Sequence, residues 1–140
     1  MKTAIALVAA WAALAAAAPA RAHVVLDQTS APAGSSYRAV FRVGHGCDGL
    51  PTRGIAVRIP AGVRAAHPMP KPGWALDVRV APLAVPVTQY GRKVDSDVAE
   101  IRWTAERGME LPDAWYDEFV MRATLPSEPG VLWFQIVQTC

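Results

Sequence analysis

The sequence predicts an all-β protein, built as an antiparallel β-sandwich of about seven strands. Two observations lead to this prediction. Short segments repeatedly alternate apolar and polar residues with a period of two, which is the pattern of a strand with one buried face and one exposed face. After the first 22 residues no long segment has helical periodicity, and six prolines between Pro60 and Pro86 exclude a long helix there.

The first four expected strands lie before residue 83. The segment HVVLDQ (23–28) begins with two valines, which favour strands. In SYRAVFRVG (36–44), aromatic and aliphatic residues alternate with two arginines. RGIAVRIP (53–60) alternates isoleucine and valine with alanine and arginine. In GWALDVRVAP (73–82), a tryptophan, a leucine and two valines fall on one face, and an aspartate and an arginine fall on the other. Each segment therefore has one face suited to a core.

Three further strands are expected in the second half of the chain. They are AEIRWT (99–104), DEFVMRATLP (117–126) and GVLWFQIVQTC (130–140), which continue the alternating pattern. The stretch HPMPKPGW (67–74) is interpreted instead as a rigid, extended connector, because each proline restrains its own φ and the residue before it. The sequence of residues 107–113 allows a small helical turn.

The first 22 residues are expected to be a secretory signal peptide. The chain begins with the dipeptide MK, residues 4–18 are almost entirely apolar, and ARA at residues 20–22 is a cleavage site of the small-x-small type. A transmembrane anchor is the alternative, but the apolar run is too short, since a spanning helix needs roughly 20 residues. We therefore expect cleavage after Ala22 and a mature domain of residues 23–140, periplasmic or secreted.

The expected mature domain is formally neutral. The whole chain has 14 Lys and Arg against 12 Asp and Glu, and loss of Lys2 and Arg21 leaves 12 of each sign. A neutral domain without a basic run lacks the electrostatic footprint of a nucleic-acid-binding protein. No segment after Ala22 resembles a membrane span.

Cys47 and Cys140 are the only cysteines in the chain. Export would place them where thiols oxidise, and an even number of widely separated cysteines favours one disulfide. This disulfide would tie the glycine-rich loop GHGCDGLPT (44–52) to the last strand. A metal or redox site is the alternative, which the sequence supports less well because it has no CxxC motif.

Cleavage after Ala22 would make His23 the first residue of the mature chain. Its α-amine and its imidazole Nδ1 could then bind one metal ion and close a six-membered chelate ring, which no internal histidine can do. Cu(II) stands highest in the Irving–Williams order and favours nitrogen and oxygen ligands. His23 is therefore a candidate ligand for Cu(II).

A chelate of this kind needs one or two further ligands. The candidates are Asp117, Glu118, His45, His67 and solvent. On the expected strand, Asp117 shares the face of the apolar residues, whereas Glu118 points to the opposite face. The alternatives are that Glu118 is a solvated surface residue, and that His67 or Met69 in the proline-rich connector is a soft metal ligand.

Five segments together resemble the YcnI-like copper-binding domain family of bacterial exported proteins. The resemblance covers nearly all of the expected mature chain, in AHVVLDQTSAPAGS, FRVGHGCDGLPT, PMPKPGW, YDEFVMRATLP and FQIVQTC. It implies a β-sandwich of the immunoglobulin or fibronectin type. It also implies Cu(II) held by the N-terminal histidine, here His23, with help from a glutamate that matches Glu118 and with a tryptophan close by. In the family pattern this tryptophan follows the QTC segment, and Trp103 and Trp133 occupy other positions.

The leading functional hypothesis is an exported copper-binding protein for copper storage, delivery or resistance, and not an enzyme. Its expected partners are the copper ion and either other exported copper chaperones or a copper importer. One alternative is a copper-dependent oxygenase, which would need a second histidine such as His45 or His67 and a flat aromatic surface for a glycan. The other alternative is a metal-free β-sandwich interaction domain.

Overall fold

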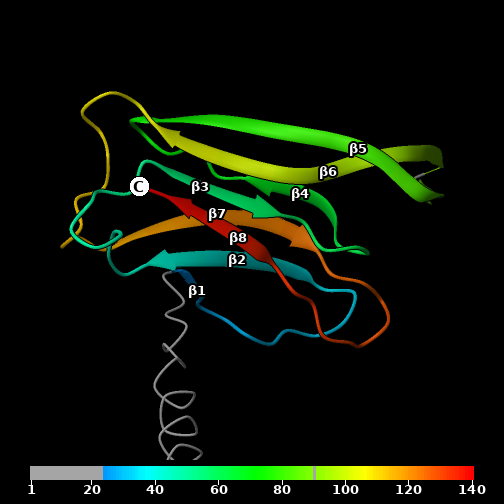
Figure 1. Ribbon diagram of the computed structural model, residues 1–140. Coiled ribbons are helices and arrows are strands. Elements are labelled where there is room, and N and C mark those ends of the chain that lie inside the picture. The colour runs from blue at the N-terminus through cyan, green and yellow to red at the C-terminus, as the bar shows by residue number, and fades with distance from the viewer. Residues whose placement is uncertain (1–23, 90) are drawn as a thin grey trace, which may run out of the picture.

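The computed structural model describes residues 24–89 and 91–140, which form eight strands in two packed sheets (Figure 1). The strands of the first sheet are β1 (Val24–Leu26), β2 (Ser36–Val43), β4 (Arg64–Pro68) and β7 (Asp117–Thr124). Those of the second sheet are β3 (Gly54–Arg58), β5 (Trp74–Gln89), β6 (Arg92–Ala105) and β8 (Gln135–Thr139). The strand orders are β1-β2-β7-β4 and β5-β6-β3-β8, and all pairings are antiparallel. This architecture confirms the predicted fold class.

The hydrophobic core lies between the two sheets and contains the residues whose alternation predicted the strands. Phe119 of β7 is at its centre, because the rings of Trp74 and Trp103 meet it edge to face, with centroids 4.9 and 5.7 Å away. The largest fully buried side chains come from both sheets and are Trp103, Phe41, Phe119, Ile55, Ile101 and Met121.

The strand β4 differs from the sequence-based expectation. His67 and Pro68 belong to it, so the prediction of an extended connector beginning at residue 67 is wrong for these two residues. The strand has no alternating pattern, and its pairing with β7 shifts between Arg64 and His67, where Ala65 has a φ of 49°. It lies at the edge of the first sheet, where a proline is tolerated because one side of the strand has no ladder hydrogen bonds to lose.

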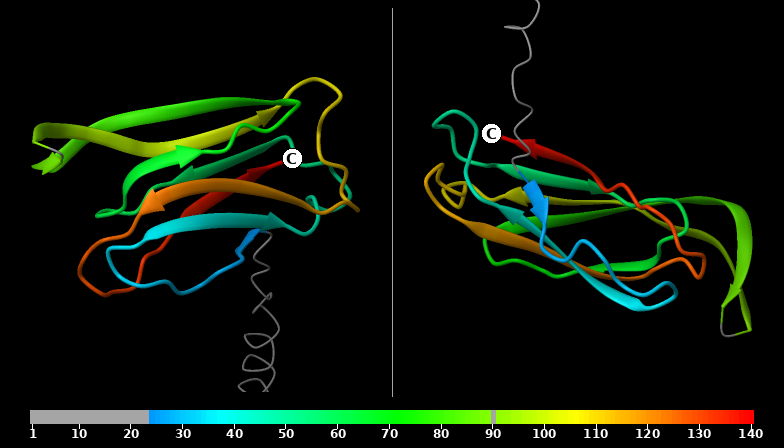
Figure 2. Two further views of the ribbon diagram at one scale, coloured as in Figure 1. Left: turned by 180° about the vertical axis from the view of Figure 1, so that it is seen from behind. Right: turned by 90° about the horizontal axis from the view of Figure 1, so that it is seen from below.

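The hairpin formed by β5 and β6 is longer than the sequence predicted. β5 continues past Pro82 and Pro86, which an edge strand accommodates, and its register with β6 shifts between Pro82 and Val87. The far part of this hairpin projects beyond the rest of the second sheet (Figure 2). The described residues 107–113 contain a turn but no helix. No helix among residues 24–89 and 91–140 is long and apolar enough to cross a membrane.

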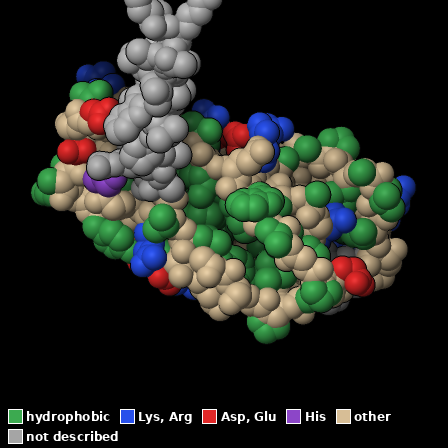
Figure 3. Space-filling model, turned by 60° about the horizontal axis from the view of Figure 1, so that its bottom comes forward, with side chains coloured by type: hydrophobic (Ala, Val, Ile, Leu, Met, Phe, Trp, Pro, Cys, Tyr) green, Lys and Arg blue, Asp and Glu red, His purple; other side chains and the backbone are tan. Residues whose placement is uncertain are grey.

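One open side of the sandwich has a shallow apolar pocket of about 260 Å³. Its walls come from β1, β2 and the segments after β1 and before β8, and they include Leu26, Tyr37, Leu132 and Phe134. Hydrophobic side chains gather around a hollow on the face turned forward in Figure 3, with charged side chains toward the edge. This side is therefore less completely covered than the core between the central strands.

Candidate functional site

The start of β1 lies at one end of the first sheet. Val24 stands opposite Val43, and Val25 stands opposite Arg42 of β2. Arg42 is in turn the cross-strand partner of Glu118 on β7. Val25, Arg42 and Glu118 therefore form one row across three strands, with β1 and β7 about 10 Å apart. His23 lies outside the described residues and directly precedes Val24 in the sequence.

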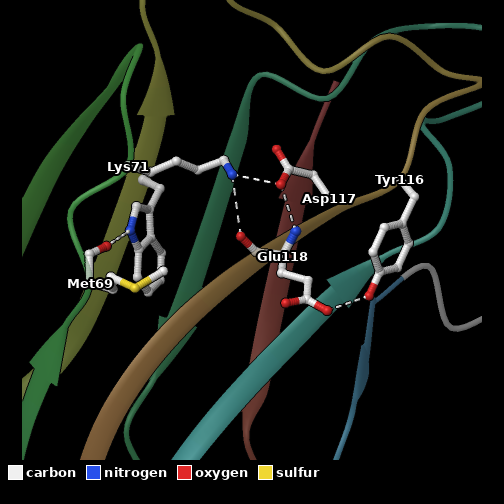
Figure 4. Close-up of polar contacts among 6 residues, drawn as sticks. Met69, Lys71, Tyr116, Asp117 and Glu118 are labelled. Atoms are coloured by element: carbon white, nitrogen blue, oxygen red, sulfur yellow. Dashed lines mark hydrogen bonds and ion pairs between the residues drawn. The ribbon is translucent and has the colours of Figure 1, made fainter.

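Glu118 is half-buried and points away from the core, as strand parity predicts. Its Oε1 accepts a hydrogen bond of 2.6 Å from the hydroxyl of Tyr116, which lies two residues earlier (Figure 4). Among the described residues Glu118 forms no ion pair. Its carboxylate is therefore held in place by a neutral donor and keeps its negative charge unpaired.

Asp117 has different surroundings from its neighbour Glu118. Its Oδ1 lies 2.6 Å from Nζ of Lys71, and the same ammonium group stands 5.2 Å from the centroid of the Phe119 ring. Figure 4 shows the two carboxylates on different sides of β7. The Lys71 pair accounts for the charge of Asp117, so Glu118 is the carboxylate of the two that is available to a ligand.

Two further charged groups lie beside Glu118. Arg42 forms an ion pair of 3.2 Å with Asp27, which follows β1, and Nε of Arg42 is buried without a hydrogen-bond partner. Asp27 thus pairs with the guanidinium group of Arg42, while Glu118 occupies the cross-strand position opposite Arg42. This excess of negative charge favours a cation over an anion at this end of the sheet.

The pKa of Tyr116 is raised above its ordinary value of about 10. The largest cause is the hydrogen bond that its hydroxyl donates to Glu118, since the carboxylate stabilises the protonated phenol. Desolvation and the charges of Glu118 and Asp27 act in the same direction, whereas Arg42 opposes them. Tyr116 therefore remains a hydrogen-bond donor throughout the neutral pH range.

Of the two other histidines, His67 lies apart from the row of Glu118, whereas His45 lies two residues after Val43, the cross-strand partner of Val24. His67 is on β4, at the opposite edge from β1, and it stands opposite Arg122, which is four residues further along β7 than Glu118. His45 follows β2, and its Nδ1 lies 2.7 Å from the carbonyl oxygen of Gly46. No group of three or more His, Cys, Asp or Glu in the described part of the chain is arranged to hold a metal.

A disulfide joins Cys47 and Cys140, whose Cα atoms lie 6.0 Å apart. Cys47 follows β2 of the first sheet, and Cys140 follows β8 of the second, so the bond links the two sheets. It lies at the end of β2 where Val24 pairs with Val43. The disulfide therefore stabilises the end of the sandwich that carries the candidate site.

The loop around Cys47 is packed tightly against the segment before β7. Gly46 donates a backbone hydrogen bond of 3.1 Å to Asp113, and Thr52 donates one of 2.8 Å to Leu111. A Cβ added at Gly46 would lie 2.0 Å from the carbonyl oxygen of Leu50. The close approach of the Leu50 carbonyl thus explains why position 46 of the glycine-rich loop is a glycine.

Trp103 and Trp133, which do not match the tryptophan of the family pattern, lie in other parts of the sandwich. Trp103 is buried in the core, where its indole N–H donates to the carbonyl of Met69. Trp133 is 80% exposed and lines a pocket with Arg58 at the end of β3. Trp115 is also exposed, and it precedes Tyr116 in the sequence.

Sequence reasoning missed Tyr116, Arg42 and Asp27 as neighbours of Glu118. The spacing of Tyr116 and Glu118 was a usable signal, because residues two apart on a strand share a face. The nearness of Arg42 and Asp27 had no such signal, because it depends on pairing between strands that are distant in sequence.

Comparisons with known proteins give a family and a fold. The family model described as "Domain of unknown function (DUF1775)" matches residues 23–140. Among solved structures, the chain is similar to an uncharacterized protein from Nocardia farcinica whose crystal structure reveals an immunoglobulin-like fold. The identity is 23%, the match covers 83% of this chain and 82% of that one, and the TM-score is 0.58. A comparison with curated proteins found no match.

Proposed function

We propose that this chain, which belongs to the DUF1775 family, is an exported copper-binding domain that holds Cu(II) through His23 and Glu118. The observation that carries the proposal is the row of Val25, Arg42 and Glu118. Because β1 begins at Val24 beside this row, a ligand supplied by the preceding residue would be near a carboxylate that already points outward.

The donor groups at this end of the sheet fit a divalent copper ion. Glu118 offers a carboxylate that forms no ion pair with any described residue, and Asp27 adds a second negative charge nearby. The α-amine and imidazole of an N-terminal His23 would supply nitrogen donors, which Cu(II) prefers together with oxygen. Tyr116 would keep the Glu118 carboxylate oriented, as partners of metal ligands commonly do.

Export is the second part of the proposal. The family match begins at residue 23, the residue that cleavage after Ala22 would expose as a free amine. This agreement supports the assignment of residues 1–22 as a signal peptide and of residues 23–140 as a periplasmic or secreted domain. The position of Glu118 on an outer sheet face is suited to copper exchange, so copper storage, or delivery to an exported chaperone or an importer, is the proposed role.

Copper binding is favoured over copper-dependent oxygenation. An oxygenase of the kind considered above would need a second histidine close to the first. His67 lies at the opposite edge of the sheet, beside Arg122. Unlike Arg42, which pairs with Asp27, Arg122 forms no ion pair among the described residues, so its positive charge would oppose a metal ion at His67. His45 lies at the same end as Val24, but its Nδ1 is 2.7 Å from the carbonyl oxygen of Gly46 in its own loop.

The proposal is tested by electron paramagnetic resonance of Cu(II) bound to the protein that begins at His23. The variant His23→Ala should lose the nitrogen coupling and most of the affinity, and Glu118→Gln should alter the spectrum while the nitrogen coupling remains. His67→Ala is the matched control and should leave the spectrum unchanged. If a form extended at the N-terminus by a few residues bound Cu(II) as tightly and with the same spectrum, the proposal would be wrong.

A further inference from the structure

A row of basic side chains crosses the outer face of the first sheet, away from Glu118. Arg38 of β2 is the cross-strand partner of Arg122 of β7, and Arg122 is also the partner of His67 of β4. All three residues are exposed. Neighbouring strands lie about 4.8 Å apart, so the row is about 10 Å long. The buried pair of Val40 and Val120 separates it from the row of Arg42 and Glu118.

The two arginines of this row lack an ion-pair partner in the described part of the chain. Neither Arg38 nor Arg122 forms an ion pair within residues 24–89 and 91–140, whereas Arg42, Arg79 and Arg102 each do. Like charges that stand directly opposite each other on neighbouring strands are destabilising. An anionic ligand would remove this repulsion, and each guanidinium group can bind a carboxylate through two parallel hydrogen bonds.

An apolar wall runs beside the basic row. Met69 is 50% exposed, and its backbone N–H donates a hydrogen bond of 2.8 Å to Val120, which fixes the residues after β4 against β7. The groove that results has a volume of about 650 Å³. Its lining includes the three residues of the basic row together with Met69, Pro70 and Val120.

The chemistry of this groove favours an anion over a soft metal ion. His67 and Met69 alone would be a plausible pair of ligands for such a metal. However, Arg122 stands directly opposite His67, and Arg38 is the next residue in the row. Two permanent positive charges at neighbouring positions repel a cation and attract a carboxylate.

We propose that this groove binds an extended acidic peptide segment of a partner protein. Alternate side chains of an extended segment point the same way and lie about 7 Å apart, so two carboxylates at such positions can both lie over a row of about 10 Å. The flanking apolar side chains of the segment would contact Met69 and Pro70. The groove shares no residue with the proposed copper site, so the failure of one proposal would leave the other unaffected.

The test is fluorescence anisotropy of the metal-free protein with a fluorescein-labelled peptide of alternating Glu and Leu. The double variant Arg38→Gln/Arg122→Gln should weaken binding by about tenfold or more, which corresponds to ~1.4 kcal/mol. Arg92→Gln is the matched control, because Arg92 is exposed on the β5–β6 hairpin and forms no ion pair in the described part of the chain. Thermal unfolding of the double variant should show unchanged or higher stability, since the repulsion between the arginines is removed.

Three results would overturn the proposal. The first is equal binding of the acidic peptide to the double variant and to the unmodified protein. The second is equal binding of a control peptide with Gln in place of Glu, which would mean that the apolar wall alone is responsible. The third is displacement of the peptide by inorganic phosphate at concentrations equal to that of the peptide, which would make the groove a general anion site.

Discussion

The hydroxyl of Tyr116 donates a hydrogen bond of 2.6 Å to Oε1 of Glu118. Tyr116 lies in the segment that enters β7, Glu118 lies in β7, and both are on the outer face of the sheet. Asp117 stands between them in the sequence and pairs with Lys71. This contact gives the proposed copper ligand a defined orientation. It also raises the pKa of Tyr116. Both consequences can be measured independently of each other.

We predict that Tyr116→Phe weakens Cu(II) binding by about tenfold, because loss of a hydrogen-bond partner of a metal ligand usually lowers affinity by 10- to 100-fold. Isothermal titration calorimetry of the protein that begins at His23 measures this change. The stability of the protein should change little, because Tyr116 is exposed. Trp115→Phe is the control and should bind copper normally. Unchanged affinity in Tyr116→Phe would show that the contact does not orient a ligand.

We predict that Glu118→Gln lowers the pKa of Tyr116 toward its ordinary value near 10. A raised pKa means that the folded state favours the protonated phenol. The resulting stabilisation is complete below pH 10 and is lost as the pH rises through the higher pKa of the folded state. Tyrosinate absorbance, taken as a difference from Tyr116→Phe, follows this one residue. The idea fails if Tyr116 titrates at the same pH with and without the Glu118 carboxylate.

We predict that Gly46→Ala destabilises the protein by about 1–3 kcal/mol, since its Cβ would overlap the backbone oxygen of Leu50 and force the loop apart. Gly44→Ala is a close control, because nothing lies within 4 Å of a Cβ added at Gly44. Its effect should be small or stabilising, at most ~1 kcal/mol. Urea unfolding of both variants separates the two cases, and equal losses would contradict this explanation of the loop.

We predict that removal of the disulfide in Cys47→Ser/Cys140→Ser lowers the free energy of unfolding by about 4–5 kcal/mol. The two cysteines are 93 residues apart, so the bond closes a long loop in the unfolded chain and removes much of its entropy. Chemical unfolding of the variant and of the reduced protein should give matching values. A loss below about 1 kcal/mol would mean that the bond constrains the unfolded chain little.

We predict that Phe119→Ala costs about 3–5 kcal/mol, because it leaves a cavity between Trp74 and Trp103. Val131→Ala is the control, since Val131 is 78% exposed and should change stability by less than about 0.5 kcal/mol. Thermal unfolding followed by tryptophan fluorescence reports both effects. A small effect of Phe119→Ala would place the centre of the core elsewhere.

Sequence reasoning succeeded where a strand crosses the core and failed at the sheet edges. On β2 and β7 one face packs against the second sheet, so its apolar residues recur at every second position, although Val40 and Val120 on the outer face are also buried. β4 and the far part of β5 lie at edges, where exposed valines and prolines replace the alternation. At such positions the strand is maintained by pairing with a neighbour, which a local pattern does not record.

The sequence alone determined which residues have a core face, the chemical identity of the candidate ligands His23 and Glu118, and the opposite directions of Asp117 and Glu118. These properties follow from strand periodicity and side-chain chemistry. Only the tertiary structure decided that Arg42 and Val25 join Glu118 in one row, and that Arg38, Arg122 and His67 form another. These neighbours lie up to 93 residues apart in sequence. Their alignment depends on the register that the two sheets adopt when they bury a common core.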